Sequence, residues 1–91
     1  MSDGEIRGEV LYIDRFGNLT TNIRTNDAYG MREITLGDVS INRLYASYNA
    51  GKQGEVSALA ASTGFLEIAV NLGSAAREIG ARVGDRVKVL L

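Results

Sequence analysis

The chain has 91 residues, of which 45% are hydrophobic and 23% are charged, enough for one small globular domain and too few for two. Ten Lys and Arg side chains against eleven Asp and Glu give a formal net charge of -1, so the chain lacks the basic surface with which proteins bind duplex nucleic acid. It contains no Cys and no His, which excludes disulfides, thiolate nucleophiles, Cys/His zinc sites and imidazole catalysis.

Neither a membrane span nor a secretory leader is recognisable in the sequence. No segment approaches the roughly 20 consecutive apolar residues that a helix needs to cross a bilayer. The first five residues, MSDGE, have no basic region followed by an apolar run. We therefore expect a single cytoplasmic domain over residues 1–91, with no membrane partner and no nucleic acid partner.

The first predicted elements form a β-hairpin. In residues 5–13 apolar side chains occupy both registers of the second half, which indicates a strand covered there on both faces. Residues 14–18 (DRFGN) have the composition of a turn. Residues 19–25 (LTTNIRT) then alternate between two faces, as half-buried strands do.

The middle of the chain predicts a second hairpin. Residues 26–30 are polar and turn-like, and residues 33–36 read as a short strand. Gly37 and Asp38 then form a tight loop into a strand over residues 39–45. We expect these two strands to pair.

The C-terminal half predicts three more strands and the only helix. The strands are separated by Gly-containing turns and cover residues 55–61, 65–70 and 86–91. Ser74 suits an N-cap and Gly80 a C′ position, which predicts a short helix over residues 75–79. About seven short strands and one short helix near the C-terminus indicate an all-β fold, a small closed or partly closed antiparallel barrel.

The turn over residues 14–18 carries two polar side chains of chemical interest. The amide of Asn18 can both donate to and accept from the edge of an adenine ring. A purely structural interpretation is also available, in which Asp14 accepts a local Asx-turn hydrogen bond and Gly17 and Asn18 tolerate positive φ. The residues alone leave both interpretations open.

Other polar groups of interest lie in predicted loops and in one strand. Tyr48 precedes a Gly-containing loop, where its ring can stack on a base or close one end of the barrel. Ser62 and Thr63 offer hydroxyl and backbone N–H groups that suit a carboxylate, although a hairpin turn needs nothing more. Glu67 alternates with apolar residues in its strand, and we expect it to point into solvent.

Two segments together resemble a known family. IDRFGNLTTNI (residues 13–23) and STGFLEIAVNLGSAA (residues 62–76) are similar to the C-terminal domain of the S-adenosyl-L-methionine hydroxide adenosyltransferases, relatives of the fluorinating and chlorinating enzymes. The resemblance runs from Gly8 to Leu91 and covers only the second half of a two-domain subunit, so we expect the N-terminal domain to be absent from this sequence. It implies a homotrimer in which S-adenosyl-L-methionine, a substrate that requires no cofactor or metal ion, binds between the N-terminal domain of one subunit and the C-terminal domain of its neighbour.

The resemblance also implies which residues bind the substrate. It assigns the methionine ammonium group to Asp14 and the adenine edge to Asn18. It places Tyr48 against the adenine ring, and Ser62 and Thr63 at the methionine end. The backbone of Asn71 and Leu72 would meet the adenine amino group. We expect all of these residues to border one common site.

The reaction implied by the resemblance is attack of hydroxide on C5′ of the ribose, giving adenosine and L-methionine. Thr63 and Val70 stand where the fluorinating branch has arginines, which favours hydroxide over halide. In the family, polar residues of the N-terminal domain, including a histidine, activate water. We therefore assign no catalytic residue to this chain and expect it to be inactive alone.

Two other functions are compatible with the sequence. One is a non-enzymatic OB-like module that stacks single-stranded nucleic acid on aromatic side chains. The small number of aromatic residues, four Tyr and two Phe, and the acidic charge balance argue against it. The other is a structural assembly domain whose loops pack against neighbours and bind no ligand.

Overall fold

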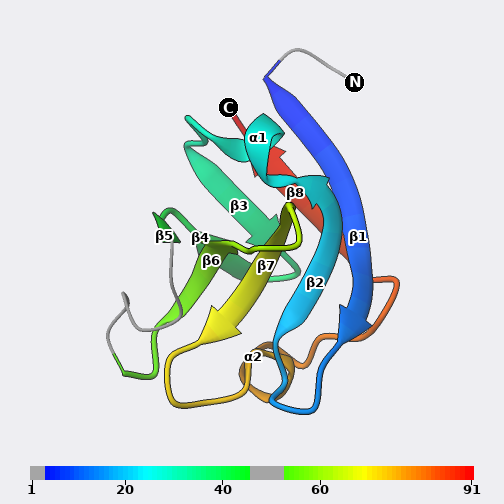
Figure 1. Ribbon diagram of the computed structural model, residues 1–91, viewed down its shortest axis with the longest axis vertical. Coiled ribbons are helices and arrows are strands. Elements are labelled where there is room, and N and C mark those ends of the chain that lie inside the picture. The colour runs from blue at the N-terminus through cyan, green and yellow to red at the C-terminus, as the bar shows by residue number, and fades with distance from the viewer. Residues whose placement is uncertain (1–3, 46–52) are drawn as a thin grey trace.

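The computed structural model describes residues 4–45 and 53–91. Within these residues eight strands form one sheet that curls into a half-barrel (Figure 1). The strands are β1 (Glu5–Ile13), β2 (Leu19–Arg24), β3 (Glu33–Leu36), β4 (Val39–Ile41), β5 (Leu44–Tyr45), β6 (Val56–Ala60), β7 (Phe65–Val70) and β8 (Arg86–Leu90). Two short helices, α1 (Thr25–Ala28) and α2 (Ala75–Ile79), lie at opposite ends of the half-barrel. The predicted fold class, an all-β and partly closed barrel, is confirmed.

The sheet is almost entirely antiparallel and does not close. Its strand order is β4-β3-β8-β1-β2-β7-β6-β5, so β4 and β5 are the two edges. Only β5 runs parallel to its neighbour, β6. The long strand β1 pairs with β2 over its second half and with β8 over its first half.

The core follows from the period-2 pattern of the strands. In β2 the side chains of Leu19, Thr21 and Ile23 point inward and are buried. In β8 Val87 and Val89 are buried while Arg86 and Lys88 are exposed, as the sequence predicts. These side chains join one hydrophobic cluster that fills the inside of the curled sheet.

The helix α2 has the predicted boundaries because both of its caps are encoded locally. The Ser74 side chain accepts a hydrogen bond from the backbone N–H of Arg77 at 3.3 Å. Gly80 adopts the left-handed conformation at φ 72° and donates its N–H to the carbonyl of Ala76.

The predicted strand over residues 39–45 is wrong, because two strands occupy this segment. β4 pairs with β3, whereas β5 pairs with β6 at the other edge of the sheet. One continuous strand cannot serve both edges of an open sheet, so the chain leaves β4 after Ile41 and crosses to β5. The described residues therefore form eight strands rather than about seven.

Two further local predictions are wrong. The segment expected to end a strand at Thr25 and then turn forms the single-turn helix α1 instead. The Thr25 N–H still donates to the carbonyl of Gly64, next to the Arg24–Phe65 pair of β2 and β7. The second half of β1 is not covered on both faces, since Leu11 and Tyr12 are 49% and 60% exposed. A register shift between Val10 and Tyr12 marks a bulge at this point.

Candidate functional site

The turn between β1 and β2 is organised by the carboxylate of Asp14. One of its oxygens, Oδ1, accepts hydrogen bonds from the backbone N–H groups of Phe16 at 2.8 Å and of Asn18 at 3.0 Å. The carbonyl of Asp14 accepts from the N–H of Gly17, which adopts φ 83°. The structural interpretation is thus confirmed for Asp14 and Gly17, whereas Asn18 is not at positive φ. The hydrogen bond from its N–H fixes the backbone of Asn18 relative to the Asp14 side chain.

This turn packs directly on the start of α2. The backbone N–H of Ala76 donates to the carbonyl of Gly17 at 2.9 Å. Gly17 also lies against Ser74, so closely that a Cβ atom at Gly17 would stand 2.7 Å from the Cβ of Ser74. Two segments that are distant in sequence, the β1–β2 turn and the loop before α2, therefore form one surface.

The loop between β7 and α2 brings Asn71 and Leu72 to the same end of the sheet. Leu19, at the start of β2, pairs with Ile68 near the end of β7, so the residues that flank these two strands meet there. The carbonyl of Asn71 accepts from the N–H of Gly54 at 2.9 Å. Leu72 is the one non-glycine residue at positive φ (57°) in the part of the chain that the structure describes, and its side chain is 80% exposed.

Four of the predicted site residues thus share the α2 end of the half-barrel. We call them the turn cluster: Asp14, Asn18, Asn71 and Leu72. The cluster offers a carboxylate, a side-chain amide and a loop backbone held in a rarely populated conformation. These are groups that can recognise a cation and the edge of a base.

Ser62 and Thr63 lie elsewhere. Their turn connects β6 to β7 at the end of β7 opposite the turn cluster (Figure 1). Thr63 Oγ1 accepts from the backbone N–H of Phe65 at 3.3 Å. The six residues of β7, about 20 Å at the rise of a strand, separate the two positions. The structure therefore does not bring Ser62 and Thr63 together with the turn cluster, and Tyr48 lies outside the described residues.

Exposed apolar side chains surround the turn cluster. Seven large apolar side chains are exposed among the described residues. Leu11 and Tyr12 lie on the second half of β1, and Phe16 lies in the turn after it. Leu72 and Val83 lie on the two loops that pack against these segments. The Arg15 guanidinium lies 5.0 Å from the centre of the Phe16 ring. Apolar groups gathered around a polar site are typical of a surface that a partner covers.

Glu67 does not point into solvent as predicted, because it is 7% exposed. It lies in β7 between Thr20 of β2 and Leu59 of β6. Both faces of this central strand are covered, so the alternation that places Leu66 and Ile68 in the core does not place Glu67 in water. Leu59 and Ala69, which share the face of the sheet with Glu67, are buried as well. The alternation in the sequence did not reveal that this face is covered.

The described residues carry no evident centre for a metal ion. No three acidic side chains among residues 4–45 and 53–91 lie close enough together to hold one. Within the same ranges no helix has the length and apolar character to cross a membrane.

Comparison with known proteins places this small β half-barrel and its turn cluster in a family. The family model described as the SAM hydroxide adenosyltransferase C-terminal domain matches residues 8–88, where SAM is S-adenosyl-L-methionine. The chain belongs to this family. It is also 36% identical over 83 residues to an (R)-S-adenosyl-L-methionine hydrolase of Thermus thermophilus.

Two solved structures share the fold. A conserved uncharacterised protein of Thermotoga maritima superposes on 100% of this chain with a TM-score of 0.83 and 28% sequence identity. A conserved hypothetical protein of Thermus thermophilus superposes on 92% of this chain with a TM-score of 0.81 and 33% sequence identity. The chain spans 31% of the hydrolase and 38% and 34% of these two proteins. This sequence therefore corresponds to about a third of the proteins that it matches.

Proposed function

We propose that this domain supplies the adenosine-binding surface of an S-adenosyl-L-methionine hydrolase that forms adenosine and L-methionine. The observation that carries the proposal is the family match over residues 8–88 together with the convergence of Asp14, Asn18, Asn71 and Leu72 at one end of the fold. The enzyme would act in the cytoplasm as a homotrimer. Its substrate would bind between this domain and the N-terminal domain of a neighbouring subunit.

Each member of the turn cluster has a distinct chemical task in this proposal. The Asn18 side chain donates to and accepts from the adenine edge, while the loop backbone at Asn71 and Leu72 meets the adenine amino group. The Asp14 carboxylate faces the methionine ammonium group, where opposite charges give a strong hydrogen bond. Tyr48 would add a ring against the adenine.

The domain would contribute positioning rather than proton transfer. The chain has no His, and the sulfonium of the substrate is already a good leaving group. What the reaction needs is a hydroxide held in line with C5′ and a reaction centre from which bulk water is excluded. A partner domain seated on the exposed Phe16 and Leu72 side chains would exclude water from the adenosine.

The methionine end of the substrate has one place in this proposal. Its ammonium and carboxylate groups are attached to the same carbon atom, so Asp14 and the Ser62–Thr63 turn of one chain cannot both hold them across the length of β7. We assign the methionine end to Asp14, because the carboxylate complements a cation and lies beside Asn18. With the methionine end at Asp14, Ser62 and Thr63 of the same chain do not contact it. They could contact the substrate only if it bound in another orientation, or contact a second ligand molecule.

A chimeric enzyme tests the proposed function. This chain would replace the matching segment of the Thermus thermophilus hydrolase, and adenosine release from S-adenosyl-L-methionine would be measured by chromatography. We expect activity from the chimera and none from the isolated chain. Because the two segments are 36% identical, the fold is expected to be retained, which circular dichroism and gel filtration check.

The outcome that would contradict the proposal is a folded, correctly assembled chimera that releases no adenosine. Titration of that assembly with adenosine would then separate two causes. Binding without turnover would restrict the domain to a ligand-binding role, whereas no binding would leave structural assembly as its function.

A further inference from the structure

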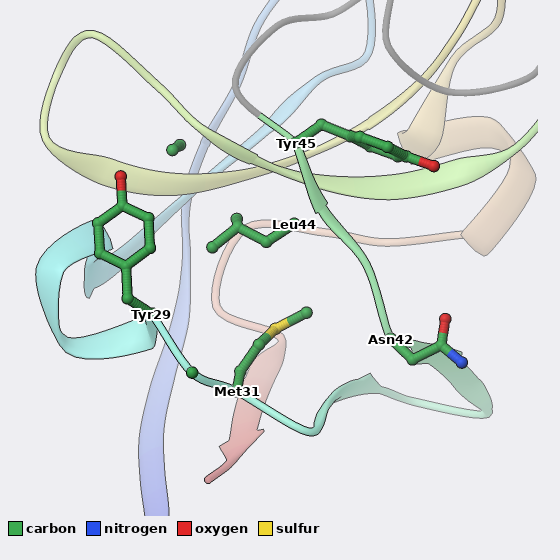
Figure 2. Close-up of a pocket in the computed structure, with 7 residues that line it drawn as sticks. Tyr29, Met31, Asn42, Leu44 and Tyr45 are labelled. Carbon is green, nitrogen blue, oxygen red and sulfur yellow. The ribbon is translucent and has the colours of Figure 1, made fainter.

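A cavity lies on the open side of the half-barrel, away from the turn cluster. It has a volume of about 340 Å³ and opens between the loop that follows α1 and the strands β5 and β6 (Figure 2). Its walls are formed by Tyr29, Gly30, Met31, Asn42, Leu44, Tyr45 and Ala60. The volume falls at the lower end of the range for small-molecule sites in proteins, about 300 to 1,000 Å³.

The cavity exists because the sheet does not close here and because two of its walls are small. Gly30 has no side chain, and a Cβ atom built on it would meet nothing within 4 Å. Ala60 contributes a single methyl group from β6. Met31 and Leu44, which also line the cavity, pack against the hydrophobic core. Their packing fixes the wall of the cavity that faces the core, while the opposite side is open.

The lining is neutral. None of the side chains around the cavity is Asp, Glu, Lys or Arg. The hydroxyl of Tyr45 donates to Glu55 Oε1 at 2.9 Å and accepts from Arg43 Nη1 at 3.2 Å, outside the cavity. The hydrogen bond to Tyr45, followed by the electrostatic interactions with Tyr45 and Glu55, raises the pKa of the Arg43 guanidinium. The guanidinium itself does not line the cavity.

The arrangement of side chains suits a flat ring. Figure 2 shows the Leu44 side chain directed toward the Tyr29 ring, with the Met31 side chain below Leu44. The Tyr45 ring and the Asn42 amide point away from Tyr29. An aromatic face, a thioether and a branched aliphatic side chain are the groups that bind an aromatic ring by stacking and apolar contact.

We propose that this cavity binds a neutral small molecule with a flat aromatic system of one or two fused rings, stacked on Tyr29 and resting on Met31 and Leu44. The exposed fraction of Tyr29, 59%, leaves much of the ring available for such a ligand. The Tyr29 hydroxyl supplies one hydrogen bond for orientation. The site is separate from the turn cluster, because Tyr29 follows α1 at the end of the half-barrel opposite α2.

Titration of the ¹⁵N-labelled chain with indole tests this site. The backbone amide signals of Gly30, Met31 and Ala60 should shift and saturate, with a Kd of about 1 mM for a ligand of this size. Tyr29→Ala should weaken binding about tenfold, because a stacking contact is lost. Ala60→Leu should weaken it similarly by filling the cavity, and circular dichroism verifies that both variants fold.

Tyr12→Ala is the matched control, because Tyr12 is exposed to nearly the same extent, 60% against 59%, but lies on β1. It should leave the Kd for indole unchanged. Indole-3-acetate, which carries a carboxylate on the same ring system, should bind more weakly than indole. Absence of saturation, equal weakening by Tyr12→Ala, or tighter binding of indole-3-acetate would each overturn the proposal.

Discussion

Gly17 and Ser74 are in such close contact that no side chain fits at position 17. A Cβ atom there would lie 2.7 Å from the Cβ and 3.1 Å from the Cα of Ser74. The contact joins the turn that carries Asp14 and Asn18 to the N-cap of α2, and the hydrogen bond from Ala76 to the Gly17 carbonyl reinforces it. Glycine at position 17 is therefore required both by its φ of 83° and by the approach of a second segment.

Gly17→Ala should destabilise the protein by about 2 to 4 kcal/mol, the sum of a left-handed conformation for a residue with Cβ and an overpacked contact. Gly30→Ala is the control, because Gly30 has the same φ of 83° with nothing within 4 Å of the added Cβ. It should cost only about 1 to 2 kcal/mol. Urea unfolding measures both variants, and equal costs would show that the contact with Ser74 contributes nothing.

Asp14 should separate into a structural and a binding role when two substitutions are compared. Asp14→Asn retains an oxygen that can accept from the N–H groups of Phe16 and Asn18 and removes the charge, so stability should change by less than about 1 kcal/mol while substrate binding weakens. Asp14→Ala loses the acceptor as well and should destabilise the fold by about 1 to 2 kcal/mol. Urea unfolding and calorimetric titration of the chimera with S-adenosyl-L-methionine measure the two effects. Undiminished affinity in Asp14→Asn would remove the assignment to the ammonium group.

Asn18→Ala should lower the affinity of the assembled chimera for adenosine by about 1 to 3 kcal/mol, the cost of lost hydrogen bonds to a buried base. Among residues 4–45 and 53–91 the amide of its side chain makes no hydrogen bond, so stability should change little. Asn26→Ala, an exposed amide in α1 at the opposite end of the fold, serves as the control. Equal affinities of the two variants would exclude Asn18 as an adenine contact.

Ser62→Ala decides where the methionine end of the substrate binds. With the methionine at Asp14, this substitution in the exposed β6–β7 turn should leave the affinity for S-adenosyl-L-methionine unchanged within about 0.5 kcal/mol. A loss comparable to that of Asp14→Asn would move the methionine end to the Ser62–Thr63 turn. Calorimetric titration of the chimera provides the measurement.

Two buried threonines should respond differently to the same substitution. Thr21 is fully buried, and its Oγ1 donates to the carbonyl of Leu66 at 2.7 Å and accepts from the N–H of Ile23 at 3.2 Å. Thr21→Val should cost about 1 to 3 kcal/mol because buried polar groups lose their partner. Thr25 Oγ1 is buried without a partner among the described residues, so Thr25→Val should be neutral or stabilising. Thermal unfolding of both variants compares them, and a cost of Thr25→Val as large as that of Thr21→Val would contradict this account.

Local chemistry explains which parts of the fold are predictable from sequence. The boundaries of α2 follow from the N-cap Ser74 and the C′ residue Gly80, and the Asx-turn at Asp14 follows from its own four neighbours. The strands β2 and β8 likewise follow from the alternation of inward and outward side chains along each segment. In the helix and the turn, the hydrogen bonds that decide the structure join residues only a few positions apart.

The parts that the sequence did not predict depend on contacts between distant segments. The break after Ile41 arises because β5 pairs with β6 across the sheet from β4. The burial of Glu67 arises from neighbours on two other strands. The separation of Ser62 from Asn18 depends on the direction in which β7 crosses the sheet, which no local pattern encodes. The cavity beside Tyr29 depends on the open edge of the sheet in the same way.

The pairing of the first and last strands restricts how the surface around Asp14 can be completed. Glu5 pairs with Leu90, so both strands reach their free ends at the pole opposite α2 (Figure 1). A domain fused before Glu5 would have to double back along the nine residues of β1, about 30 Å, to touch Asp14 of its own polypeptide. A domain from another copy faces no such detour. In the proposed hydrolase, this geometry would favour complementation in trans, in which two copies that are defective in different halves restore each other's activity on mixing.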